Sequence, residues 1–154
     1  IHGKLDNEQR SQIKLMYEQN ILLLNKYLEY NAGPSAPTGK IRYHSKPIVD
    51  SILTFKGLNV QALPHHVFSF GDKEIGAIWF VAKKKGFTRD ELGMFTDILY
   101  RYLKKNHSPE YNINNEYCLA VDVVELFDVT YAQIKSGEVK PILTQTINEI
   151  LRLR

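Results

Sequence analysis

The sequence is poor in sulfur. Its 154 residues include one cysteine, Cys118, and two methionines. A single cysteine has no partner in the chain, so an internal disulfide framework and a thiolate metal site are excluded. Cys118 lies within the apolar stretch 117–121, where no neighbouring charge would activate a thiol. We interpret it as a buried, unreactive side chain.

Long apolar runs and specific enzyme motifs are also missing. No stretch approaches the roughly 20 apolar residues that cross a bilayer, and the start does not resemble a signal peptide. G-x-G-x-x-G, phosphate-loop, H-E-x-x-H and G-x-S-x-G patterns are absent, which argues against common nucleotide-cofactor enzymes and hydrolases. We therefore expect a cytoplasmic protein with no cofactor and no membrane contact. Its first residue is Ile1, which is consistent with trimming, tagging or excision from a longer protein.

The composition that remains is that of a folded domain. Hydrophobic residues make up 44% of the chain and charged residues 24%, close to the averages for globular proteins. We expect a single domain over residues 1–154, with an N-terminal helix at about 7–31, a flexible connector at 33–39 and a core at 46–154. The connector is rich in glycine and proline, which favour turns.

The N-terminal helix is predicted from apolar residues three and four positions apart. These residues are Ile13, Tyr17, Ile21, Leu24 and Leu28. Further apolar side chains lie outside this stripe, which indicates burial on two sides, either within the domain or against another chain. For a homo-oligomer, the candidate interface residues are Leu23, Tyr27 and Tyr30.

The core pattern predicts alternating helices and strands. We expect a short helix from Pro47 to Gly57, a strand at 58–63, and a hairpin of strands 67–70 and 75–82 around the turn 71–74. Apolar residues at consecutive positions of the second hairpin strand indicate that helices cover both of its faces.

The C-terminal half continues this alternation. A capping box of Thr88 and Glu91 begins a helix that ends near Asn106, and a buried strand at 117–124 follows as a parallel crossover. A second capping box, Thr130 with Gln133, and a helix at 139–151 complete the chain. The predicted fold class is α/β, with α+β as the alternative: a small mixed sheet with a β-hairpin and a parallel crossover strand, flanked by helices.

Positive charge is concentrated in the middle of the chain. The net charge is +3 overall, and residues 34–64 and 65–105 each carry an excess of three basic groups. Such a surface could bind nucleic acid or an acidic protein partner if its members share a face. The candidate binding residues are Lys40, Arg42, Tyr43, Lys46, Lys83, Lys84, Lys85 and Arg89. The alternative is an ordinary solvated surface.

An enzymatic alternative follows from the element order. Helix, three strands, helix, strand resembles the core of restriction-endonuclease-like nucleases, in which two carboxylates hold Mg²⁺ beside a lysine. The candidate catalytic residues would be Asp72, Glu74, Lys83 and Asp122. Val81 and Ala82 precede Lys83 where that pattern needs a carboxylate, so the site would be degenerate or rearranged.

A buried aspartate and three histidines are further candidates for functional sites. Asp122 lies between valines in a strand predicted to be buried, so we expect it to pair with a lysine, arginine or tyrosine, or to meet a ligand at the sheet end. His65 and His66 face opposite sides of an extended chain, and His44 lies in the basic loop, so we expect no metal site. A non-catalytic binding domain is the leading hypothesis, followed by an oligomerisation domain and then a nuclease.

Overall fold

A computed structural model of the chain describes residues 7–29, 37–44 and 50–154. The chain divides into two compact units, Ile1–Asn31 and Ala32–Arg154. Of the positions singled out above, Tyr30, Lys46, Pro47 and residues 33–36 lie outside the described residues. Within the first unit, the described side chains are Arg10–Leu22, Leu24 and Asn25. Leu23, Tyr27 and Leu28 are therefore placed by their backbone alone.

The described part of the first unit is one helix, α1 (Asn7–Glu29), which confirms the predicted N-terminal helix over these residues. Every described side chain of α1 is exposed. Lys14 and Glu18 form an ion pair one helical turn apart, 3.9 Å between Nζ and Oε1. The large apolar side chains that α1 exposes are Ile13, Leu15, Met16, Tyr17, Ile21, Leu22 and Leu24.

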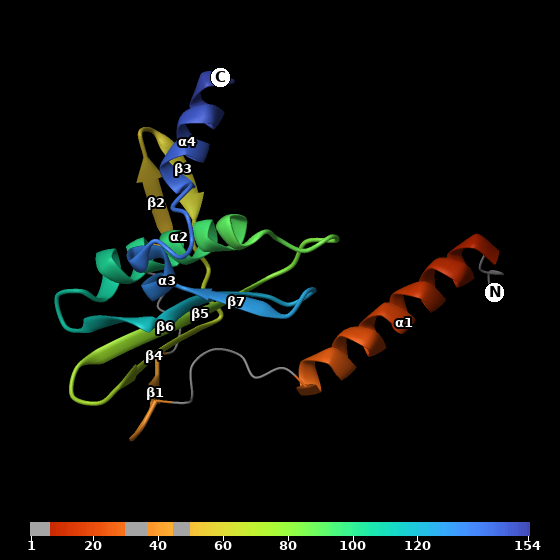
Figure 1. The fold of residues 1–154 in the computed structure, drawn as a ribbon, viewed down its shortest axis with the longest axis horizontal. Helices are drawn as coiled ribbons and strands as arrows, with labels where there is room; N and C mark the ends of the chain where they lie inside the picture. The colour runs from red at the N-terminus through yellow and green to blue at the C-terminus, as the bar shows by residue number, and fades with distance from the viewer. Residues whose placement is uncertain (1–6, 30–36, 45–49) are drawn as a thin grey trace. The chain divides into compact units, whose positions relative to one another are not determined.

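The second unit is built on a five-stranded mixed sheet (Figure 1). Its strands are β1 (Arg42–Tyr43), β4 (His66–Phe70), β5 (Glu74–Val81), β6 (Asn112–Asp122) and β7 (Phe127–Thr130). They lie side by side in the order β1-β4-β5-β6-β7. β5 and β6 are parallel, whereas the other pairs are antiparallel. The α/β class, the hairpin and the parallel crossover are confirmed.

A separate hairpin replaces the helix predicted from Pro47 to Gly57. β2 (Ile52–Phe55) and β3 (Leu58–Gln61) pair antiparallel. The turn between them is Lys56-Gly57, with φ of 50° and 85°. A two-residue turn with positive φ at both positions is the type I′ turn, whose twist matches that of paired strands. The helical prediction was wrong because it took this turn glycine for a helix C-cap.

The helix α2 (Arg89–His107) lies between the sheet and this hairpin. Thr88 and Glu91 form the predicted capping box at its start. Leu92, Leu99 and Leu103 are fully buried and join the helix to the strands, while Leu53 of β2 packs into the same core. On its outer side, Lys105 Nζ donates a hydrogen bond to the Ile52 carbonyl at 3.0 Å.

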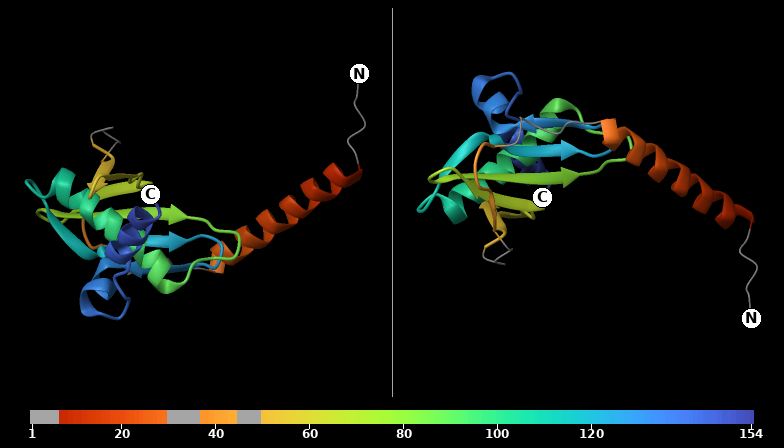
Figure 2. Two further views of the ribbon diagram at one scale, coloured as in Figure 1. Left: turned by 90° about the horizontal axis from the view of Figure 1, so that it is seen from above. Right: turned by 90° about the horizontal axis from the view of Figure 1, so that it is seen from below.

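The end of the chain adds one strand and two helices. β7 was not predicted. α3 (Tyr131–Ser136) begins at the Thr130–Gln133 capping box and ends at Gly137, which has φ of 85°. α4 (Leu143–Arg152) starts four residues later than the predicted helix. In Figures 1 and 2, α2, α3 and α4 lie on one side of the five-stranded sheet.

Among the helices of the described residues, none is both long and apolar enough to cross a bilayer.

Candidate functional site

The two faces of the sheet have different coverings. Along β5, the side chains of Ile75 and Ala77 are fully buried in the core beneath α2, and Trp79 packs edge-on against Phe95 of α2 at 5.5 Å. Side chains alternate along a strand, so the residues between them point the other way. That second face carries none of the helices α2, α3 and α4, and we call it the helix-free face (Figure 1). Helices were expected on both faces of β5, and the three helices of this unit lie on one of them (Figure 1).

The helix-free face holds a pocket of about 520 Å³, here called the aromatic pocket. Its apolar wall is formed by Phe68, Ile78, Phe80, Leu119 and Val121. Its more polar part is formed by Tyr43, His44, His65, His66 and Tyr117. Pro37, Ile41 and Val67 complete the lining. The volume lies in the range of small-molecule sites, and a mainly apolar wall with a few polar groups is their usual composition.

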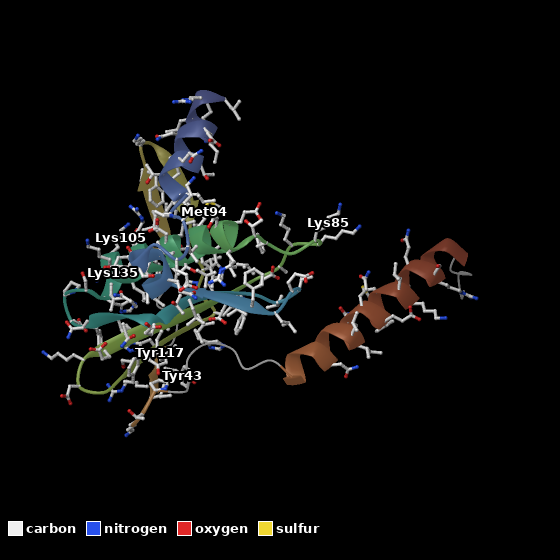
Figure 3. The ribbon with its side chains drawn as sticks, in the orientation of Figure 1. Tyr43, Lys85, Met94, Lys105, Tyr117 and Lys135 are labelled. Atoms are coloured by element: carbon white, nitrogen blue, oxygen red, sulfur yellow. The ribbon has the colours of Figure 1, made fainter. Side chains whose placement is uncertain are left out.

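Seven rings are in continuous contact across the helix-free face, and we call them the ring cluster. They are Tyr43, His65, His66, Phe68, Phe70, Phe80 and Tyr117. The tightest contact joins Phe70 and Tyr117 at 4.9 Å between centroids. All the contacts are edge-on or tilted, and none of these pairs is stacked face to face. Figure 3 shows Tyr43 and Tyr117 on the side of the sheet away from α2.

Histidines fix the pocket edge next to β1. His44 follows β1, and its backbone N–H donates to the Val67 carbonyl at 2.8 Å. Its Nε2 lies 3.0 Å from the Ser69 hydroxyl oxygen. His65 Nδ1 accepts a hydrogen bond from the Phe80 backbone N–H at 3.2 Å. Since Nδ1 is an acceptor there, the neutral His65 ring carries its proton on Nε2.

His44 also belongs to a second aromatic cluster. The His44 ring packs edge-on against His107 and Tyr111, at 5.8 and 5.4 Å between centroids. Burial lowers the pKa of His107, positive charge on His44 lowers it further, and Glu110 opposes the shift. The surroundings of His107 therefore favour its neutral form.

The structure places the two predicted basic clusters far apart. Tyr43 pairs with Phe68, which pairs with Gly76 near the start of β5. Lys83 follows the other end of that strand, and the five residue steps from Gly76 to Val81 alone span about 16 Å. Tyr43 therefore lines the aromatic pocket, and Lys40 and Arg42 lie on the same edge segment of the chain. The other group, Lys83, Lys84, Lys85 and Arg89, lies around the loop between β5 and α2, where Figure 3 labels Lys85.

Two cations of the second cluster are already paired. Lys83 binds Glu91 at 3.1 Å, and Arg89 binds Glu138 at 2.8 Å. The pKa of Glu91 is lowered, first by the hydrogen bond from the Thr88 backbone and then by Lys83. Among the described residues, Lys84 and Lys85 form no ion pair. Of the four cations in this group, Lys84 and Lys85 are therefore the two without an ion pair in the described part of the chain.

The side-chain contacts of Asp122 are hydrogen bonds that hold backbone segments together. Its side chain is fully buried, and its oxygens accept backbone hydrogen bonds from Phe87 at 2.7 Å, Val124 at 2.8 Å and Glu125 at 3.1 Å. The expected lysine, arginine or tyrosine partner is replaced by these amides. They tie the loop before α2 to the turn after β6, and charge-assisted bonds of this kind stabilise a buried carboxylate.

The four nuclease candidates do not converge. Asp72 and Glu74 lie at the β4–β5 turn, at one end of β5, whereas Lys83 and Asp122 lie at the other end. Within residues 7–29, 37–44 and 50–154, no group of three His, Cys, Asp or Glu side chains is arranged to hold a metal ion. Cys118 is fully buried, and burial together with the Asp97 charge raises the pKa of its thiol.

No family model, curated protein or solved structure matches this chain. Its function therefore has to be inferred from its own residues. Reasoning from the sequence identified Tyr43 but missed the rest of the ring cluster. The signal was present in β4, where the alternate residues His66, Phe68 and Phe70 are all rings.

Proposed function

We propose that the second unit is a non-catalytic binding domain whose ligand occupies the aromatic pocket. The observation that carries this proposal is a pocket of about 520 Å³ on the helix-free face. Burying apolar surface there supplies affinity, and the surrounding imidazole and phenol groups supply orientation.

The chemistry of the lining favours binding over catalysis. The thirteen lining residues include no carboxylate, lysine, arginine, serine or thiol. His44 contacts the Ser69 hydroxyl, which lies outside the lining, and His65 accepts a hydrogen bond from the Phe80 backbone. These contacts position the two rings at the pocket.

The experiment is a ¹H–¹⁵N NMR titration with indole, an uncharged aromatic probe. We expect shifts at pocket-lining amides such as Ile78, Phe80 and Leu119. Ile78→Trp should fill the pocket and weaken indole binding. Ile52→Trp is the matched control, because Ile52 is 47% exposed on β2 and lies outside the lining. Shifts scattered over the surface, or equal binding by the two variants, would contradict the proposal.

The first unit supports a second candidate function, self-association through α1. Seven large apolar side chains of this helix are exposed, with 58% of Ile21 and 64% of Leu24 accessible. An isolated helix of 23 residues gains most of its stability from packing an apolar face. Two of the described charges, Lys14 and Glu18, already pair within the helix, so this pair does not oppose contact with a second copy.

Sedimentation equilibrium tests this candidate. We expect Ile21→Glu combined with Leu24→Glu to reduce the solution mass to that of one chain. Gln12→Glu combined with Gln19→Glu adds the same charge to polar positions of α1 and should leave the mass unchanged. A wild-type chain that is monomeric at all concentrations would refute self-association.

A further inference from the structure

We propose that the aromatic pocket accepts a base of a single-stranded nucleic acid, while Lys40 and Arg42 bind the adjoining phosphates. This inference deepens the proposed function and rests on it, because it names the ligand class of the same pocket. It also distinguishes Lys40 and Arg42, which we expect to bind phosphate, from Lys84 and Lys85, which we expect not to contact the nucleic acid.

The first argument comes from the ring cluster. A nucleobase is planar and uncharged, and it binds proteins chiefly by stacking on aromatic side chains. Tyr43 is 67% exposed, and its ring touches His66 at 6.1 Å and Phe68 at 6.2 Å, in both cases at a steep angle. Such contacts hold the Tyr43 ring in place, while most of the side chain stays accessible. A pre-positioned, accessible ring is what a stacking base requires.

The second argument comes from the distribution of charge. The pocket lining has no Asp, Glu, Lys or Arg side chain, and its polar groups are three imidazoles and two phenols, which can hydrogen-bond to the edges of an uncharged planar base. Lys40 and Arg42 alternate in sequence with the lining residues Ile41 and Tyr43, so they belong to the same edge segment but point out of the pocket. Both cations are exposed and, within the described residues, neither has an ion-pair partner. A pocket without carboxylates, next to an edge strand with two unpaired cations, matches a base whose phosphate chain follows that edge.

The third argument concerns the strand form of the nucleic acid. A base in a duplex has both faces covered by its neighbours and cannot enter a pocket without leaving the stack. The aromatic pocket is a concavity on a sheet and not a helix that could enter a major groove. The partner is therefore a single strand, whose bases are free to turn outward.

The test is fluorescence anisotropy with labelled U12, A12 and dT12 single strands and a 12-base-pair duplex, over a range of salt concentrations. We expect at least one single strand to bind more tightly than the duplex. Tyr43→Ala should weaken binding about tenfold or more, as loss of one stacked base does. Tyr43→Phe keeps the ring and should bind like the wild type. Because Tyr43 is largely exposed, both variants are expected to fold.

Two double variants test the phosphate contacts. Lys40→Ala with Arg42→Ala should reduce the steepness of the log affinity against log salt plot by about 1.4, since each phosphate contact with a single strand contributes about 0.7. Lys84→Ala with Lys85→Ala removes equal charge from the distant loop and should leave affinity and slope unchanged. Binding lost in the second double variant and kept in the first would overturn the inference, as would equal affinity for the duplex.

The failure of this inference can be told apart from the failure of the proposed function. If indole occupies the pocket but none of the oligonucleotides binds, the pocket is a ligand site for another class of partner, and the nucleic-acid inference is wrong. If neither indole nor an oligonucleotide binds there, both are wrong.

Discussion

Gly76 of β5 lies directly against the carbonyl oxygen of Tyr117 in β6. A Cβ atom at position 76 would come within 2.6 Å of that oxygen and 3.0 Å of Phe68 Cζ. The pairing of the two strands changes register at this point, between Ile75 and Ala77. Glycine allows this close approach, and the approach brings Phe68 and Tyr117, two pocket-lining rings, next to one another.

Gly76→Ala should destabilise the fold and distort the aromatic pocket. The added methyl meets backbone, which cannot move aside as a flexible side chain would, and overpacking of this kind costs about 1–3 kcal/mol. Urea unfolding measures the loss, and the indole titration measures the pocket. An unchanged unfolding midpoint would show that the strands separate easily at this position.

Asp122→Ala should cost about 2–4 kcal/mol in unfolding free energy, because it removes the acceptors of three backbone N–H groups at a buried position. Asp122→Asn should cost less, since its amide oxygen can still accept from Val124 and Glu125. Asp72→Asn in the exposed β4–β5 turn is the control. Urea denaturation of the three variants gives the comparison. Equal stability of Asp122→Ala and the wild type would mean that water replaces the carboxylate.

Thr96→Val should destabilise the protein by about 1–3 kcal/mol despite its nearly unchanged shape. Thr96 is fully buried; its hydroxyl donates to the Val129 carbonyl at 2.8 Å and accepts from the Ala120 N–H at 3.2 Å. Valine leaves both backbone groups without that partner. Thr96→Ser keeps the hydroxyl and should recover the hydrogen-bond part of the loss, as measured by thermal unfolding. If the Thr96→Ser protein is no more stable than the Thr96→Val protein, the loss of stability comes from packing and not from the hydrogen bonds.

The stability of the fold should decrease as the pH falls below about neutrality, partly through His107. Burial and His44 lower its folded-state pKa below the ordinary 6.5. Between these two values the unfolded chain binds more protons, so the free energy of unfolding rises with pH across that interval. His107→Gln should flatten the dependence of urea midpoint on pH between 5 and 7.5. Identical slopes for variant and wild type would contradict this role.

Local signals in the sequence were sufficient for much of the fold. The capping boxes at Thr88 and Thr130 are set by side chains three residues away, and both form as predicted. The hairpin of β4 and β5 follows from its turn residues in the same way. The β2–β3 hairpin was missed because Ile52 and Leu53 fit an apolar helical face as well as a strand, and because the decisive conformation is at Lys56-Gly57.

The candidate site required the structure because it depends on pairing between distant segments. Consecutive apolar residues in β5 indicate that both faces are covered, but they do not distinguish a helix from a layer of rings. Tyr43, Phe68 and Tyr117 are brought together by the register of four strands. The same register separates Lys40 from Lys84, although both belong to the basic middle of the sequence.

The buried Cys118 makes this chain well suited to spectroscopic labelling. It is the sole thiol, it is fully enclosed beneath α2, and its raised pKa keeps the unreactive protonated form. A cysteine introduced at an exposed position, for example by Lys85→Cys, would therefore react alone with maleimide or nitroxide reagents. Probes can be attached to the folded protein one site at a time without first replacing the native cysteine.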